Sequence, residues 1–247
     1  MESFNYEIEA RERENHWWFV VRQKFFAREI RKLGLARNAN ILDLGTSTGT
    51  NLQMLKDLGF TNVTGLDLSP EAIRFCAQKG LGPVIEGSIE SLPFTDNAFD
   101  LVLATDVIEH VDHDLKAVSE INRVLRPNGR VILTVPAFPS LWGLQDEVSH
   151  HKRRYRMKPL KEIVRQSGLR EEKNFYFNYL LFLPIFVTRQ ILSRKKHQIK
   201  NENEINSPMI NSVLKWVFSL DVLTAPFLKP VVGVSAYLLA RKSSSTT

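Results

Sequence analysis

The sequence is poor in cysteine and lacks any uninterrupted apolar run of membrane-spanning length. Cys76 is the only cysteine in 247 residues, so the chain forms no internal disulfide and holds no cysteine-based zinc site. Residues 1–16 carry many charges and contain no apolar core, so we expect no secretory signal there. The apolar regions 179–192 and 209–240 are broken by prolines and charges, so we expect neither to cross a membrane. These absences favour a cytoplasmic protein, and we expect no metal ligands.

The charge balance is basic, with a net charge of +6 and an isoelectric point near 9.4. Basic residues gather at Arg22 to Lys32, Lys152 to Lys158 and Arg194 to Lys196. Such clusters favour anionic surroundings such as phosphates, nucleic acid or acidic lipid, or they are simply solvated faces. With 43% hydrophobic and 24% charged residues, the chain can bury a substantial core.

From residue 40 onward, apolar strand patterns alternate with amphipathic helix patterns. ILDLG from residue 41 and FDLVLAT from residue 99 are nearly continuous in apolar residues, which is typical of parallel strands buried on both faces. SPEAIRFCAQKG at 69–80 predicts a helix with Ser69 as its N-cap. We therefore expect an α/β fold, a doubly wound Rossmann-like parallel sheet with helices on both faces.

Two segments lie outside this alternation. Aromatic and basic residues at helical spacing in 17–33 predict an N-terminal helical cap within residues 1–37. The apolar stretch 179–232 precedes a last strand at 233–242, so we expect a helical insertion that acts as a lid or a membrane-surface element. The sheet domain is then formed by 38–178 together with that last strand.

The loop after the first strand has the composition of a cofactor loop. In open α/β sheets, ligands lie beyond the carboxyl ends of the strands. Glycines at 45 and 49 let the backbone approach a ligand closely. From Gly45 the spacing reads Gly-x-Ser-x-x-Thr, which fails the dinucleotide fingerprint and so argues against a dehydrogenase. No lysine follows the loop, so it also fails as a phosphate-binding loop.

The stretch Asp43-Leu44-Gly45-Thr46-Ser47-Thr48-Gly49 resembles the first motif of class I S-adenosylmethionine-dependent methyltransferases, of the type 11-like subgroup. It departs from that motif at Ser47, where either a small residue with an ordinary φ fits at little cost, or the loop shifts and cofactor affinity falls. Three further segments resemble the family in the same order: VTGLDLS, GSIESLPFTDNAFDLVLATDVIEHV and LRPNGRVILTVPA. The resemblance implies S-adenosylmethionine as cofactor, with contacts from Asp43, Gly45, Thr46, Ser47, Gly49, Asp67, Leu68, Ser88, Ile89, Thr105 and Asp106. Asp67 matches the acidic residue that accepts hydrogen bonds from the ribose hydroxyls.

An oxygen acceptor needs a general base as well as alignment with the methyl group. Histidine suits that task near neutral pH, and His110, His150 and His151 all follow predicted strands. The segment HHKRRYRMKPL lies near the acceptor side of such folds. We interpret Arg153, Arg154 and Tyr155, together with Trp18, as acceptor contacts, the alternative being a basic surface loop that pairs with nearby acids.

The apolar additions favour a small or lipid-linked acceptor, and they also fit peripheral contact with an anionic membrane. Nucleic-acid bases are disfavoured, because Thr105-Asp106-Val107-Ile108 stands where base-methylating relatives carry Asn/Asp-Pro-Pro-aromatic. Methylation at nitrogen or carbon, or a binding module without turnover, stays open as an alternative. The sequence gives no indication of the oligomeric state.

Overall fold

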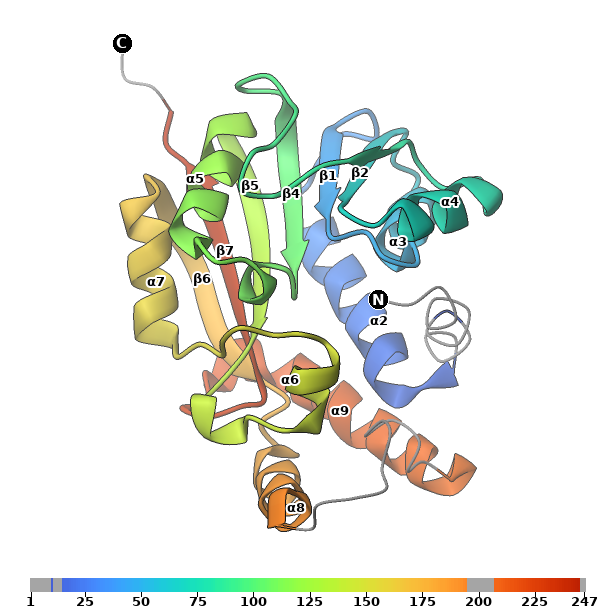
Figure 1. The fold of residues 1–247 in the computed structure, drawn as a ribbon, viewed down its shortest axis with the longest axis vertical. Helices are drawn as coiled ribbons and strands as arrows, with labels where there is room; N and C mark the ends of the chain where they lie inside the picture. Colours follow the sequence, from blue (N-terminus) through green and yellow to red (C-terminus); the bar gives the residue numbers. More distant parts are fainter. Residues whose placement is uncertain (1–9, 11–14, 195–206, 245–247) are drawn as a thin grey trace.

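The computed structural model describes residue 10 and residues 15–194 and 207–244. Its centre is a seven-stranded sheet with the order β3-β2-β1-β4-β5-β7-β6 (Figure 1). The strands are β1 (Asn40–Leu44), β2 (Asn62–Asp67), β3 (Val84–Glu86), β4 (Phe99–Thr105), β5 (Leu125–Pro136), β6 (Leu169–Phe177) and β7 (Ser235–Lys242). The first five pair in parallel, as the sequence predicts.

The sheet is mixed because of β7, whose direction the sequence pattern did not give. This strand runs antiparallel to both of its neighbours, β5 and β6. A strand covered on both faces is apolar throughout, so its sequence pattern carries no information about direction. The α/β, Rossmann-like class is confirmed by the sheet order.

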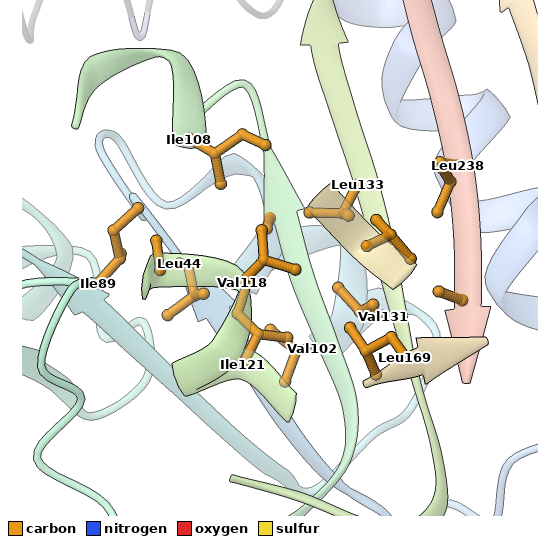
Figure 2. Close-up of a cluster of buried hydrophobic side chains, with 14 of the residues drawn as sticks. Leu44, Ile89, Val102, Ile108, Val118, Ile121, Val131, Leu133, Leu169 and Leu238 are labelled. Atoms are coloured by element: carbon orange, nitrogen blue, oxygen red, sulfur yellow. The ribbon is translucent and has the colours of Figure 1, made fainter. Parts of the chain in front are cut away.

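Helices cover both faces of the sheet. Side chains from β1, β4, β5 and β7 meet those of α5 (Asp114–Val124) on one face, where Val118 and Ile121 point toward Val102 (Figure 2). That face also receives α7 (Met157–Gln166). The remaining helices are α2 (Trp17–Lys32), α3 (Thr50–Asp57), α4 (Pro70–Gln78), η1 (Ile108–His110), η2 (Pro139–Leu141), α6 (Leu144–Val148), α8 (Phe182–Arg194) and α9 (Pro208–Leu228). Ser69 caps α4 through its side chain, as predicted.

The second face is covered by α2, α3 and α9, which places the N-terminal helix beside the insertion. Trp17 and Trp18 pack on Phe218 of α9 with ring centroids 5.3 and 5.1 Å apart. The backbone N–H of Trp17 donates to Asn211 at 2.8 Å. Figure 1 shows α2, α6, α8 and α9 gathered at the end of the sheet toward which β4 runs. This end carries the candidate site.

None of the helices in the described ranges is both long and apolar enough to cross a membrane. The predicted basic group Arg194 to Lys196 falls outside the side chains that the structure describes.

Candidate functional site

A cavity of about 670 Å³ lies at the carboxyl ends of the strands. This volume is within the range of roughly 300–1,000 Å³ usual for small-molecule sites. Ten of the residues predicted from the sequence line it: Trp18, Gly45, Thr46, Ser47, Asp67, Thr105, Asp106, His110, His151 and Arg154. The opposite wall comes from α2, α8 and α9, with Phe26, Ile185 and Leu214 among its apolar members.

The loop between β1 and α3 turns sharply because three of its residues have left-handed backbones. Gly45, Ser47 and Gly49 have φ of 69°, 49° and 76°. Ser47 therefore lacks the ordinary φ that the first alternative requires, and serine carries a strain of about 1–2 kcal/mol that glycine would avoid. A Cβ on Gly45 would lie 2.8 Å from Val107, and one on Gly49 would lie 2.6 Å from Leu81. Neighbouring side chains thus leave no room for a Cβ at either glycine. This is a second reason for glycine there, besides the close approach of a ligand.

Asp67 stands at the end of β2 and fixes the loop that follows β1. Its Oδ2 accepts from the backbone N–H of Ser47 at 2.8 Å, and its Oδ1 accepts from that of Ser69 at 2.9 Å. A carboxylate offers about four lone-pair sites, so each oxygen keeps capacity for another donor. Asp67 therefore holds the loop in place and still presents an acceptor surface to the cavity.

A residue that the sequence did not mark, Asn51 on α3, connects two predicted positions. Its side-chain amide donates to Asp43 at 2.8 Å and to Thr105 at 3.0 Å. Asp43 is fully buried and does not line the cavity, so in this structure it supports the loop from below. The only available signal was the position of Asn51 directly after the loop motif.

Three further positions that the resemblance assigns to the cofactor, Leu68, Ser88 and Ile89, do not line the cavity, and neither does Gly49. Ile89 packs into the core, and the Ser88 hydroxyl accepts from the backbone of Glu90 at 3.2 Å. Leu68 is 65% exposed. Their roles in cofactor binding stay predictions.

Arg22 of α2 reaches across the cavity to the end of β4. Its guanidinium lies 2.5 Å from the Asp106 carboxylate and 3.3 Å from the Thr134 hydroxyl. It also stacks over the rings of Trp18 and Phe26. The sequence places Arg22 in a basic cluster, and only the tertiary packing shows that it contributes to the site.

Asp146, another residue without a sequence signal, organises the acceptor side. It is fully buried and accepts from His151 Nδ1 and Arg154 Nε, both at 2.8 Å, while Arg189 of α8 lies at 3.5 Å. Burial on its own raises the pKa of Asp146, but the hydrogen bond from His151 and the charge of Arg154 bring the pKa below its ordinary value. The carboxylate therefore stays ionised and orients two predicted residues.

Glu109, His110 and His151 converge beside this network. One ligand atom from each residue lies within 4.8 Å of the others, and all three residues line the cavity. Burial raises the pKa of Glu109 well above its usual range, with Asp106 adding to the effect. Burial also lowers the pKa of His110 to about 4, helped by the neighbouring His151. His110 is therefore neutral at physiological pH.

The structure places three other predicted acceptor residues away from the cavity lining. His150 is exposed with φ 55°. Arg153 pairs with Asp114 at 2.9 Å, and the Tyr155 hydroxyl donates to the same carboxylate, also at 2.9 Å. Burial, with Asp114 adding to it, raises the pKa of Tyr155. The described contacts of Arg153 and Tyr155 are thus internal to the fold.

Residues 42–133 match the family "Methyltransferase domain". The chain is 32% identical over 127 residues to a demethylmenaquinone methyltransferase of Chlorobaculum tepidum, covering 51% of each chain. It is 32% identical over 140 residues to a malonyl-[acyl-carrier protein] O-methyltransferase of Pseudescherichia vulneris, covering 54% of this chain and 55% of the other. The chain thus spans about half the length of the curated relatives it matches.

A solved structure from Galdieria sulphuraria, assigned as a sarcosine dimethylglycine methyltransferase, superposes with a TM-score of 0.63 at 21% identity. It covers 91% of this chain and 86% of that one, which shows the shared fold. The chain has the fold of class I S-adenosylmethionine-dependent methyltransferases, and its residues 42–133 are similar to such domains in sequence. More narrowly, the family model that matches residues 42–133 is that of the type 11 group, and S-adenosylmethionine is the cofactor of its class.

The site fits this cofactor. Asp67 offers two partly used carboxylate oxygens at the end of β2, which suits the paired hydroxyls of a ribose. The tight turn at Gly45 to Ser47 brings its backbone to the cavity wall. No lysine or arginine lies within this loop, as expected for a cofactor without a phosphate.

Proposed function

We propose that the chain transfers the methyl group of S-adenosylmethionine to a small or lipid-like acceptor, at an oxygen atom. The observation that carries this proposal is that the proposed cofactor residues and the proposed acceptor residues line one and the same cavity. Asp67 and the Gly45 loop form one end, and His151, Arg154 and the apolar wall of α8 and α9 form the other. The matched relatives support a small-molecule acceptor, since their names specify a demethylmenaquinone and a malonyl-carrier ester.

When bound, the cofactor supplies an electrophilic methyl group on its sulfonium. The chain's own part is to hold the acceptor in line, which contributes on the order of 7–11 kcal/mol. Trp18, Phe26 and Ile185 offer apolar surface for this purpose. Arg154 offers a positive charge, held by Asp146 and by the Ala137 carbonyl at 2.8 Å.

His151 is the predicted base whose placement suits proton removal best. The Asp146 carboxylate is ionised and can only accept hydrogen bonds, as it does from Arg154 Nε. The proton shared between His151 and Asp146 is therefore on Nδ1 of His151. This leaves Nε2 with a lone pair on the side of Glu109. His150 lacks a comparable position, because it is exposed and off the cavity lining.

The test is turnover with methyl-labelled cofactor and a panel of hydroquinones, phenols and acyl-carrier carboxylates, with S-adenosylhomocysteine measured as product. We expect label in an ether or ester. His151→Ala should lower the rate about 10²–10⁴-fold, whereas His150→Ala should change it little. Cofactor binding without product from any acceptor would favour a binding module, and label on nitrogen or carbon would contradict the choice of oxygen.

The proposed lipid-like acceptor and membrane contact are supported by the outer side of α9. Exposed apolar residues recur there at alternating spacings of four and three: Met209, Val213, Trp216, Leu220, Leu223 and Phe227. An apolar helix side next to basic residues such as Lys215 suits an anionic membrane surface.

Sedimentation with vesicles rich in anionic lipid tests this contact. The protein should pellet with the vesicles, and Trp216→Glu combined with Phe227→Glu should leave it in the supernatant. Leu115→Glu, on α5, is the matched control and should pellet like the unaltered chain. Failure of the unaltered protein to bind would leave α8 and α9 as a lid only.

A further inference from the structure

We infer that Glu109, His110 and His151 form a binding site for a divalent transition-metal ion, with zinc as the best-fitting probe. Two imidazole nitrogens and one carboxylate oxygen are the donor set of many three-ligand zinc sites, which keep a further position for water or substrate. One ligand atom from each of the three side chains lies within 4.8 Å of the others.

The buried carboxylate of Glu109 is the strongest observation. The residue is fully buried, and neither of its carboxylate oxygens has a hydrogen-bond partner among the described residues. A buried polar group without a hydrogen-bond partner costs about 1–3 kcal/mol of stability, and a charged group costs more. Native structures satisfy such groups, so a cation supplied from outside accounts for this arrangement.

The nearby arginines do not take that role, because each is engaged with another carboxylate. Arg22 lies 2.5 Å from Asp106, and Arg154 lies 2.8 Å from Asp146. Glu109 instead faces His151 Nε2 at 3.9 Å, a distance at which no hydrogen bond forms.

Each of the two histidine rings makes a hydrogen bond that orients it for binding a metal through its other nitrogen. His151 donates its Nδ1 proton to Asp146 at 2.8 Å, which leaves Nε2 as the free electron-pair donor. The ring of His110 is hydrogen-bonded to the backbone of His150, and it meets the ring of His151 with centroids 4.8 Å apart. Histidines that ligate a metal characteristically use the second ring nitrogen in this way, which fixes the ring and its tautomer.

The three side chains also come from rigid and neighbouring segments. Glu109 and His110 lie in the 3₁₀ turn η1 after β4, and the backbone of Lys152 donates to the Glu109 carbonyl at 2.9 Å. Zinc bound at about 2.0–2.2 Å holds its ligand atoms about 3–3.5 Å apart, so side-chain rotation closes the site.

All three residues line the cavity, so the open position of the ion faces the acceptor. A bound ion would favour acceptors with a coordinating oxygen and would stabilise the deprotonated form of that oxygen. His151 would then act as a ligand and not as the base itself. This role in turnover rests on the proposed methyl transfer, whereas the metal site does not.

The test uses the full chain, purified without a histidine tag and stripped with chelator. Titration with Zn²⁺ alone in a calorimeter should give one site with a Kd tighter than about 10 µM. Co²⁺ should bind with a visible spectrum of a site with nitrogen and oxygen ligands. Glu109→Gln and His151→Asn each remove a proposed ligand, so each should weaken zinc binding by at least the roughly 10- to 100-fold that follows the loss of an outer-shell partner. His113→Asn, at an exposed histidine, is the matched control and should bind as before.

A second measurement on the unaltered protein decides the matter if either variant fails to fold. Among the six histidines, Zn²⁺ should shift the imidazole ring signals of His110 and His151 by NMR, with the exposed rings unmoved. No stoichiometric binding, equal binding by Glu109→Gln, or shifts confined to other histidines would overturn the site. Zinc binding without methyl transfer to any acceptor would count against the proposed function and leave the metal site standing.

Discussion

The two ends of the cavity are built in different ways. At the proposed cofactor end, the cavity is lined by one short loop, Gly45 to Ser47, and by the Asp67 carboxylate that accepts from the backbone of that loop. At the acceptor end, side chains from α2, the turn after β4, the α6 region and α8 meet, although more than 160 residues separate Arg22 from Arg189. We therefore expect single substitutions at the first end to change ligand binding with little effect on folding. Substitutions at the second end should also lower the free energy of unfolding.

The largest expected effect falls on the acceptor end. Asp146→Ala should reduce the free energy of unfolding by about 3–5 kcal/mol, because it leaves Arg154 and Arg189 buried without this counter-charge. Urea unfolding followed by circular dichroism measures the loss. Glu147→Ala, its exposed neighbour, should change the free energy by less than about 0.5 kcal/mol. Equal effects of the two variants would contradict the claim that the contacts of Asp146 with Arg154 and Arg189 stabilise the fold.

A second prediction concerns pH and Asp221 of α9, which accepts hydrogen bonds from the backbone between β6 and α8. Burial raises the pKa of Asp221 to about 6 from its ordinary 3.8, despite hydrogen bonds from the backbones of Leu180 and Asn178. The folded state then binds the proton more tightly than the unfolded state. The stabilising contribution is complete below pH 3.8 and is lost as pH rises through about 6, with a total of about 3 kcal/mol. Unfolding free energies from pH 4 to 7 should fall for the unaltered protein relative to Asp221→Asn, and parallel curves would refute the assignment.

At the cofactor end, Asp67→Ala should weaken cofactor binding about 10- to 100-fold. A hydrogen bond to a charged group contributes about 1.5–3 kcal/mol, and the change also releases the backbone of Ser47. Calorimetric titration with S-adenosylhomocysteine measures this. Glu86→Ala is the matched control, because Glu86 is the exposed register partner of Asp67 on β3. Unchanged affinity in Asp67→Ala would undo the ribose assignment.

The smallest expected effect is that of Ser47→Gly. Glycine removes the strain of φ 49°, about 1–2 kcal/mol, but makes the unfolded chain more flexible by about 0.4–1 kcal/mol. Stability should therefore rise by no more than about 1.6 kcal/mol, with cofactor affinity unchanged within a few fold. Thermal melts measure the stability, and calorimetric titration measures the cofactor affinity. A tenfold gain in affinity would instead show that serine holds the loop in a geometry that weakens cofactor binding.

The parts of the molecule that depend on local sequence could be predicted from it. The alternation of strands and helices, the N-cap at Ser69 and the position of Asp67 all follow from residues close together in the chain. The direction of β7 could not, since a strand buried on both faces looks the same either way. The left-handed backbone of Ser47 was also missed, because serine gives no signal for it.

The acceptor network was beyond prediction for another reason. Asp146 belongs to no motif, and its importance comes from burial beside His151 and Arg154. The sequence marked those two residues as unusual but could not separate them from Arg153 and Tyr155, which make contacts within the fold. Likewise Glu109 stands beside a predicted histidine, and only the structure shows that its carboxylate is buried without a hydrogen bond among the described residues.

The place of β7 in the sheet has a consequence for biosynthesis. β7 follows the other described strands in the sequence, yet it lies between β5 and β6, and among those strands β6 pairs with β7 alone. While the ribosome is still adding residues 178–234, β1 to β5 can already pair, but β6 has no strand to bind. The cofactor end can thus take shape on the nascent chain, and the acceptor end is completed only after residues 235–242 emerge.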